Sequence, residues 1–372
     1  MALRVLVADD SAVFRRAISE ALATIPEVQV VGSAPNGKIA LQKVLDLKPD
    51  LLTLDMEMPE LDGLAVLDAL KQAGCTTSVM VISAITIRGG RLTMQALEKG
   101  AFDFFTKPQG KDAAESTAII ARELAPRLRA LAHRRQIRDI LRPGTLGSGT
   151  QSPVASKLSA PASGTRPARE GVSRLPTAPP EVVLIGVSTG GPAALARLLP
   201  LLPKDIGVPI VVVQHMPPIF TQSLAESLAA KCSLRVREAA EGDKLEAGLV
   251  LIAPGGRQMR LASSPDTFAR VQITDDPPEN NCRPAVDYLF RSAAHGFPGR
   301  AMAVILTGMG NDGTLGLRLL KRHGCFVVAQ DEATSVVFGM PKAAIEAGVV
   351  DVVLPLDGIA TRILASVRGR GT

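Results

Sequence analysis

The 372-residue sequence contains no tryptophan, one tyrosine and only 3% aromatic residues. Proteins that bind single-stranded nucleic acid without sequence preference need aromatic side chains on which bases stack, so this scarcity argues against that class. The formal net charge of +6 does not reverse the argument, because ten basic and two acidic residues between Arg127 and Arg174 carry more positive charge than the whole chain. Nucleic-acid binding therefore stays open only through that basic segment.

Long apolar runs and clustered cysteines are also missing. The longest apolar runs are far shorter than a membrane span, so no membrane insertion is expected. Arg4, Asp9 and Asp10 stand where a signal peptide would need apolar residues, which predicts a cytoplasmic protein. No CxxC pair occurs, so we expect reduced structural thiols and neither a disulfide framework nor a zinc site. The four cysteines are Cys75, Cys232, Cys282 and Cys325.

Short apolar segments alternate with helical patterns from residue 3 to about 125. This fivefold alternation predicts an N-terminal flavodoxin-like (βα)5 domain with a parallel sheet between helices. The expected strands are 4–8, 28–33, 51–54, 79–82 and 102–105. The expected helices are 12–22, 38–47, 64–72, 91–99 and 112–141, the last continuing beyond the domain.

The composition changes at residues 143–180, which contain seven Pro, five Gly and six Ser and no aromatic residue. Such a segment cannot build a core, so it is interpreted as a flexible linker. The alternation resumes at 181–370, which predicts a second α/β domain, doubly wound around a mostly parallel sheet. Its expected strands are 182–186, 210–214, 249–253, 301–307 and 326–330. Ligands of such sheets bind at the carboxyl ends of strands.

Polar side chains stand at four strand ends of the N-terminal domain. Asp9 and Asp10 follow the first strand, and Asp55 ends the third. Three converging carboxylates repel one another unless a hard cation neutralises them, and oxygen ligands suit Mg²⁺. Ser83 ends the fourth strand and Lys107 follows the fifth, where a hydroxyl and an ammonium could contact a phosphoryl group carried on Asp55. The alternative is that the two aspartates cap a helix and the lysine is a surface charge.

These five residues make the N-terminal domain resemble a response-regulator receiver domain. The resemblance implies that Asp55 is the phosphoacceptor and that Asp10 and Asp55 bind Mg²⁺ directly, with Asp9 acting through water. It also implies that the function resides in the domain after the linker. The positions expected to sense the phosphoryl group are Ser83, Lys107 and, in the place of the aromatic switch residue, Phe104.

The second domain opens on VVLIGVSTGGP, a strand that breaks into glycines around Ser188. The segment fits G-x-S-x-G, a sharp strand-to-helix turn that exposes a nucleophile. An anion-binding loop at a helix N-terminus would use the same glycines, so this motif alone leaves nucleophile and phosphate loop open.

The next strand favours the nucleophile. A dinucleotide site would carry Asp or Glu at the end of its second strand, whereas this strand ends in Gln214-His215, and His215 suits a general base. Asp312, after a later strand, would hydrogen-bond the far nitrogen of His215, or it would cap the following helix. Backbone N–H groups of Thr189 and around Met309 are candidate oxyanion donors. Cys282 is a poorer nucleophile, because no histidine stands in register with it.

The segments IGVSTGG, VVQHMPP, LIAPGG, RPAVDYLF, ILTGMGNDG and VFGMPKAA together resemble the catalytic domain of the chemotaxis protein-glutamate methylesterases, the CheB family. The resemblance implies a Ser188–His215–Asp312 triad that hydrolyses glutamate γ-methyl esters on chemoreceptors, needs no cofactor for that step, and in many members deamidates receptor glutamines. It implies a chemotaxis histidine kinase as phosphodonor, and a receiver that docks over the active site until Asp55 is phosphorylated. The sequence departs from the family in its longer, more basic linker and in Cys282, where a basic residue is more usual.

Three other classes remain as alternatives. A response regulator with a nucleic-acid-binding output would use the basic segment. A nucleotide-dependent oxidoreductase or transferase would use the glycine loop, and a non-catalytic adaptor would hydrolyse no ester.

Overall fold

The structure is a computed structural model that describes residues 2–108, 110, 112–140, 176, 178–264 and 267–369. The predicted linker at 143–180 lies outside the described residues except at 176 and 178–180. Within the described part of the chain, no helix combines the length and apolar character needed to span a membrane.

The N-terminal domain is a five-stranded sheet in the order β2-β1-β3-β4-β5, and all of its strand pairs are parallel. The strands are β1 (Leu3–Ala8), β2 (Val28–Ala34), β3 (Leu51–Asp55), β4 (Ser78–Ser83) and β5 (Asp103–Thr106). The helices are α1 (Ala12–Ala23), α2 (Gly37–Leu47), α3 (Gly63–Gln72), α4 (Ile87–Glu98) and α5 (Ala113–Ile140).

Alternating side chains divide this domain into two cores. Leu52 and Leu54 of β3 point to the face covered by α2, α3 and α4, while Leu51 belongs to the core under α1 and α5. Because successive side chains of a strand face opposite sides, strands buried on both faces are almost wholly apolar. For this reason the expected bounds of the strands lie close to the observed ones. The predicted flavodoxin-like fold is confirmed.

The C-terminal domain contains a seven-stranded sheet in the order β14-β13-β12-β6-β7-β9-β8, with every pair parallel. Its strands are β6 (Val182–Val187), β7 (Ile210–Gln214), β8 (Arg235–Glu238), β9 (Leu249–Ile252), β12 (Ala301–Ile305), β13 (Phe326–Gln330) and β14 (Val352–Leu354). A separate antiparallel hairpin is formed by β10 (Gln258–Ser264) and β11 (Thr267–Thr274).

Helices cover both faces of this sheet, so the predicted doubly wound architecture is confirmed. One core lies beneath α6 (Gly191–Leu198), α7 (Phe220–Ala229) and α11 (Leu356–Arg368). The other lies beneath α8 (Val286–Gly296), α9 (Thr314–Arg322) and α10 (Met340–Glu346). Sequence patterns missed the edge strands β8 and β14 and the β10–β11 hairpin.

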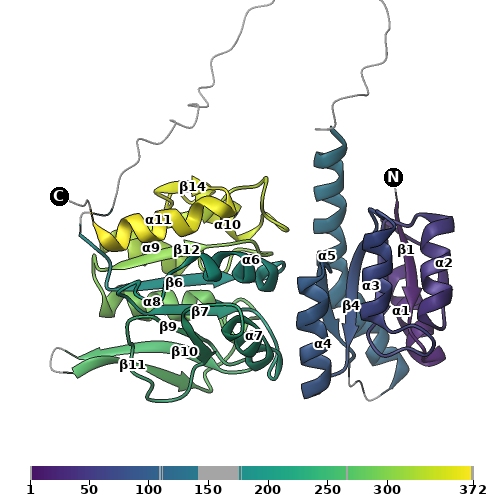
Figure 1. The fold of residues 1–372 in the computed structure, drawn as a ribbon, viewed down its shortest axis with the longest axis horizontal. Helices are drawn as coiled ribbons and strands as arrows, with labels where there is room; N and C mark the ends of the chain where they lie inside the picture. Colours follow the sequence, from purple (N-terminus) through teal and green to yellow (C-terminus); the bar gives the residue numbers. More distant parts are fainter. Residues whose placement is uncertain are drawn as a thin grey trace, which may run out of the picture.

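The two domains pack together through α4, which contacts α6 and α7 (Figure 1). The ring of Phe104 on β5 stacks on Phe220 of α7, with centroids 4.8 Å apart. At the periphery, Glu98 of α4 accepts a hydrogen bond from Ser227 and pairs with Lys231. An apolar contact with a charged rim is typical of a specific interface.

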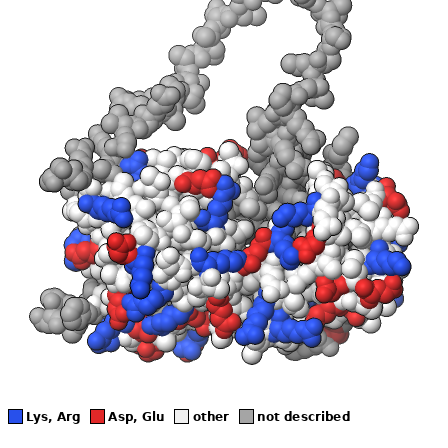
Figure 2. All heavy atoms as spheres, viewed as in Figure 1, with Lys and Arg blue, Asp and Glu red and all other residues white. Residues whose placement is uncertain are grey.

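Charges of both signs are interspersed over both domains on the face drawn in Figure 2, without one large single-sign patch. The basic segment proposed as a nucleic-acid surface lies mostly outside the described residues, from 141 onward.

Candidate active site

The candidate residues of the C-terminal domain lie at the carboxyl ends of three neighbouring strands. Ser188 follows β6, His215 follows β7, and Asp312 lies in the loop after β12. The strand order reverses direction at β6, which has β7 on one side and β12 on the other. Such a switch point opens a crevice at the carboxyl edge of a parallel sheet, and the three residues gather there.

The turn that carries Ser188 is fixed by the backbone around it. The Ser188 N–H donates to the carbonyl of Thr307, at 3.0 Å. Gly190 has φ of 78°, a left-handed conformation that side chains disfavour. A Cβ on Gly308 would lie 2.8 Å from the Ser188 Cβ, so the loop after β12 approaches the serine too closely for any other residue.

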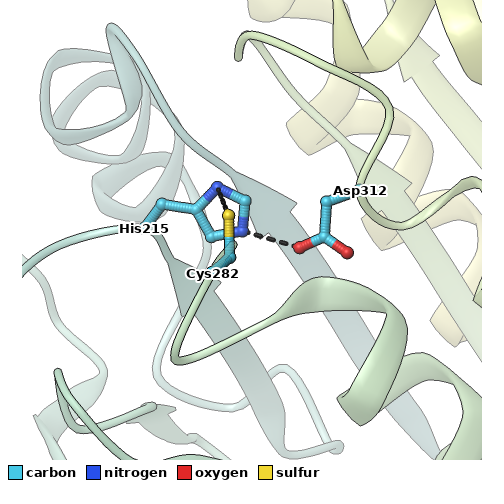
Figure 3. A group of neighbouring side chains, drawn as sticks. All are labelled: His215, Cys282 and Asp312. Carbon is cyan, nitrogen blue, oxygen red and sulfur yellow. Dashed lines mark hydrogen bonds and ion pairs between the residues drawn. The ribbon is translucent and has the colours of Figure 1, made fainter. Parts of the chain in front are cut away.

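His215 is held between its backbone and a carboxylate. Its N–H donates to the carbonyl of Val187, at 3.2 Å, which continues the β6–β7 pairing by one residue. Its Nε2 lies 2.7 Å from Oδ2 of Asp312, and the His215 side chain is 13% exposed (Figure 3). Asp312 therefore fixes Nε2 of the imidazole, and Nδ1 lies on the ring edge away from Asp312.

The Asp312 carboxylate accepts several hydrogen bonds besides that of His215. The backbone N–H groups of Val286 and Asp287, at the start of α8, donate to it at 2.7 and 3.1 Å, and Asn280 Nδ2 donates at 3.0 Å. Burial alone would raise the pKa of Asp312, but the hydrogen bond and charge of His215 and the backbone donors outweigh it, so the pKa is lowered. Asp312 is thus held ionised.

Cys282 contacts the second nitrogen of the imidazole. Its Sγ lies 3.6 Å from Nδ1 of His215, on the ring edge away from Asp312 (Figure 3). The expectation that no histidine stands in register with Cys282 is therefore wrong, because the fold brings His215 to it. The two residues are 67 positions apart in the sequence. The loop between β11 and α8 brings Cys282 back to the carboxyl edge of the sheet, and no local sequence pattern predicts this path.

These neighbours set the charge of His215. Burial lowers its pKa, yet the hydrogen bonds to Asp312 and Cys282 and their negative charge raise it more strongly, to about 9. The carboxylate of Asp312 therefore stabilises the positively charged imidazolium. Nδ1 and Nε2 face different partners, which is the arrangement of a hydrogen-bonded relay.

The site opens into a cavity of about 840 Å³ between the two domains. Its wall on the C-terminal side includes Ser188, Thr189, His215, Cys282 and Met309. Its wall on the N-terminal side includes Asp103, Phe104, Arg122, Glu123 and Arg127.

One polar contact crosses this cavity. Asp103, buried at the start of β5, is hydrogen-bonded to the side chain of Thr189 and pairs with Arg127 of α5, at 3.1 Å. Burial raises the pKa of Asp103 despite these partners. The residue beside Ser188 is thus held by the N-terminal domain.

The acidic cluster of the N-terminal domain forms a second candidate site. The carboxylate oxygens of Asp9, Asp10 and Asp55 lie within 4.8 Å of one another. Lys107 Nζ lies 2.6 Å from Asp55 and 3.0 Å from Asp9. Burial is the main cause that raises the pKa values of Asp9 and Asp55, despite this lysine. Asp9 and Asp55 are buried and Asp10 is exposed, and Lys107 supplies one positive charge against three carboxylates. The cluster therefore offers the oxygen ligands and the excess negative charge that suit a divalent cation.

The two remaining predicted sensing residues lie on the side of this cluster that leads to the domain interface. Ser83 is buried, and its hydroxyl donates to the carbonyl of Gly89 in α4, at 3.2 Å. Phe104 is also buried, because Phe220 of the other domain covers it. The N-terminal acidic site is therefore linked through α4 and β5 to the surface that meets the C-terminal domain.

Comparison with known proteins identifies both domains. A family model described as "CheB methylesterase" matches residues 183–363, and one described as "Response regulator receiver domain" matches residues 5–118. A protein of Desulfotalea psychrophila named "Protein-glutamate methylesterase/protein-glutamine glutaminase" is 46% identical over 98% of this chain and 99% of its own length. The chain belongs to the CheB methylesterase family.

Two other proteins similar to the chain are a curated relative and a solved structure. A protein of the same name from Trichodesmium erythraeum is 41% identical over 97% of this chain and 98% of its own. The crystal structure of the CheB methylesterase catalytic domain of Thermotoga maritima is 45% identical, with a TM-score of 0.49, over 50% of this chain and 97% of that one. The predicted family is confirmed, and it gives the nucleic-acid, dinucleotide and adaptor alternatives no support.

The charge of His215 can be tested by titration. Because Cys282 and Asp312 both raise the pKa of His215, Cys282→Ala and Asp312→Asn should each lower it from about 9 toward the ordinary value of about 6.5. NMR titration of the imidazole in the full chain measures this directly. A raised pKa means that protonation of His215 stabilises the fold below about pH 6.5 and that this contribution is lost as pH rises through the folded-state pKa.

Cys232→Ala is the matched control, since Cys232 contacts no histidine among the described residues. Its His215 should titrate as in the parent chain. Identical titration of all three variants would show that neither neighbour perturbs the imidazole.

Proposed function

We propose that the chain is a phosphorylation-activated serine hydrolase that removes methyl groups from glutamate γ-methyl esters of chemoreceptors and deamidates receptor glutamines. The observation that carries this proposal is the His215–Asp312 contact of 2.7 Å in a cavity that Ser188 also lines. The chemoreceptors would be the substrates and a chemotaxis histidine kinase the phosphodonor, both met in the cytoplasm.

In the proposed ester reaction Ser188 is the nucleophile and His215 the base. Because Nε2 is engaged with Asp312, Nδ1 is the nitrogen that would accept the serine proton. The serine oxygen attacks the ester carbonyl, methanol leaves with the proton from His215, and water then hydrolyses the acyl-enzyme. Asp312 keeps Nε2 protonated and stabilises the imidazolium between the two proton transfers.

Donors for the developing oxyanion are available beside Ser188. We assign this role to the backbone N–H groups of Thr189 and Met309, residues that line the same cavity. The hydroxyl of Thr307 donates to the carbonyl of Thr189, at 2.9 Å, which helps to fix the backbone just after Ser188. No cofactor is required for this chemistry.

The receiver domain would act as a gate over this cavity. Residues of β5 and α5 form part of the cavity wall, so the docked receiver occupies space that a receptor helix would need. Mg²⁺ held by Asp10 and Asp55, with Asp9 acting through water, would support phosphoryl transfer to Asp55. Lys107 and Ser83 would then turn toward the phosphoryl oxygens, and Phe104, packed on Phe220, would shift and weaken the docking.

The nucleophile is tested by Ser188→Ala. Loss of the attacking hydroxyl should lower kcat for methyl-ester hydrolysis by about 10⁴–10⁶-fold, with the fold intact. Mass spectrometry of a methylated receptor, which detects loss of the methyl group, measures this. Ser233→Ala, on the loop after α7, is the control, and near-normal ester hydrolysis by Ser188→Ala would refute the assignment.

Phosphorylation control is tested by Asp55→Asn. This variant should keep the basal rate but lose activation by a small phosphodonor with Mg²⁺, because the amide cannot accept the phosphoryl group. The rates of ester hydrolysis with and without phosphodonor measure the effect. Equal stimulation of the variant and the parent chain would exclude Asp55 as the control point.

The docking surface is tested by Glu98→Lys. The substituted cation would face Lys231 and lose the Ser227 hydrogen bond, so the undocked state should gain population and the unphosphorylated basal rate should rise several-fold. Glu20→Lys, which breaks the Arg16 pair on α1, is the matched control. A gate at this surface is ruled out if both variants keep the parent rate.

A further inference from the structure

A histidine, a cysteine and an aspartate meet at the carboxyl edge of the C-terminal sheet. Ligand atoms of His215, Cys282 and Asp312 lie within 4.8 Å of one another. The sulfur of Cys282 lies 3.6 Å from Nδ1 of His215, and Asp312 Oδ2 lies 2.7 Å from Nε2 of the same ring (Figure 3). The proposed ester reaction uses the histidine and the aspartate and gives the cysteine no role.

We propose that Cys282 Sγ and His215 Nδ1 form a binding site for Zn²⁺, and that the bound ion inhibits the hydrolase. The ion would occupy the nitrogen that the ester reaction needs as its base, so zinc binding and turnover would exclude each other. The binding site requires only the two side chains, whereas the inhibition rests on the proposed function. The absence of a CxxC pair predicts no zinc site, but ligands that are 67 positions apart leave no spacing signal in the sequence.

The separation of the two ligand atoms suits a tetrahedral zinc ion. Zn²⁺ binds cysteine sulfur at about 2.3 Å and histidine nitrogen at about 2.0–2.1 Å, and at the tetrahedral angle these lengths place sulfur and nitrogen about 3.6 Å apart. Cys282 Sγ and His215 Nδ1 are 3.6 Å apart. The two atoms therefore need little change in their separation to receive one ion.

Asp312 makes the contact that zinc-binding histidines have on their second nitrogen. A ligating imidazole almost always donates its other ring N–H to a carboxylate, a carbonyl or water, and a carboxylate there orients the ring and makes the ligating nitrogen more basic. Asp312 engages Nε2 of His215 in this way, and the backbone N–H groups of Val286 and Asp287 fix the carboxylate in turn. The histidine is thus oriented before an ion binds.

The loop that carries the sulfur is also fixed, and it opens to the cavity. The Cys282 N–H donates to the carbonyl of Glu279, at 2.8 Å, and Asn280 Nδ2 donates to Asp312, at 3.0 Å. The carbonyl oxygen of Asn280 lies 3.4 Å from Cys282 Sγ, so an oxygen ligand is available beside the sulfur. Cys282, Asn280 and His215 all line the cavity of about 840 Å³, through which an ion and its water ligands reach the site.

The ligand types select a soft cation. Thiolate sulfur and imidazole nitrogen favour Zn²⁺, whereas Mg²⁺ and Ca²⁺ take oxygen ligands. The cysteine need not be ionised beforehand, because a thiol that binds a metal ion loses its proton in the complex. The oxygen cluster of Asp9, Asp10 and Asp55 has the opposite preference. The two clusters of one chain would therefore take different ions.

Binding is tested by equilibrium dialysis of the full-length protein against Zn²⁺, with excess Mg²⁺ to occupy the acidic cluster of the receiver. The medium is kept at about pH 8, because both ligands release protons on binding. The parent chain should hold one Zn²⁺ that Cys282→Ala and His215→Ala each bind at least about 100-fold more weakly, since the loss of even an outer contact weakens a metal site by about 10–100-fold.

Cys232→Ala is the matched control for dialysis, since it removes another partly exposed thiol of the same domain. It should bind Zn²⁺ as the parent chain does. Unchanged binding by Cys282→Ala or by His215→Ala would overturn the proposal.

Co²⁺ in place of Zn²⁺ identifies the sulfur ligand. A sulfur-to-metal charge-transfer band should appear in the near-ultraviolet spectrum of the parent chain and of Cys232→Ala, and it should be absent from Cys282→Ala. A parent spectrum without this band, or a band that persists in Cys282→Ala, would exclude Cys282 as the ligand.

Inhibition is tested on the methylated receptor, with each variant compared with its own rate in the absence of Zn²⁺. At a Zn²⁺ concentration about ten times the measured Kd, about nine-tenths of the sites are filled, so the parent rate of ester hydrolysis should fall about tenfold. A zinc chelator should restore it. Cys282→Ala should lose little of its own rate at that concentration, and equal fractional inhibition of the two proteins would overturn the inhibitory role.

The binding and activity experiments fail separately. If the parent chain hydrolyses no receptor ester, the proposed function fails, while dialysis and the Co²⁺ spectrum still report whether Cys282 and His215 bind an ion.

Discussion

The contact between His215 and the buried carboxylate of Asp312 is the interaction on which the site depends. Backbone N–H groups at the start of α8 and the Asn280 amide hold that carboxylate, so removing the imidazole would leave a buried charge still partly satisfied. Removing the carboxylate would instead free the imidazole to rotate and would leave several donors without an acceptor at once. Asp312 is therefore both the electrostatic partner of His215 and the point where α8, the Cys282 loop and the loop after β12 meet.

The same carboxylate decides which nitrogen of His215 takes part in chemistry. With Nε2 engaged by Asp312, Nδ1 is the nitrogen that remains, and Cys282 Sγ lies 3.6 Å from it. In the proposed reaction Nδ1 would accept the serine proton and then return it to the leaving group, so one protonation equilibrium of His215 would govern both steps.

Much of the architecture could be predicted because strands buried on both faces are nearly continuous apolar runs, and β1, β3, β6 and β12 are of this kind. The edge strand β8, Arg235–Glu238, was missed because charged and apolar residues alternate over only four positions. Ser188, His215 and Asp312 could be chosen because each follows a strand that the apolar pattern locates. Cys282 could not be paired with His215, since the pairing depends on the β10–β11 hairpin and on a turn with two left-handed asparagines, neither of which leaves a periodic signal.

The cavity between the domains has walls from both of them, and Asp103 holds Thr189 across it. In the proposed gate, a receptor segment in that cavity and the docked receiver would exclude each other. Coupling between two sites is reciprocal, because the free energy by which one event favours the other is the same in both directions. A receptor segment bound at Ser188 would then favour the phosphorylated form of Asp55 as strongly as phosphorylation favours receptor binding, so the substrate itself would act as a signal to the receiver.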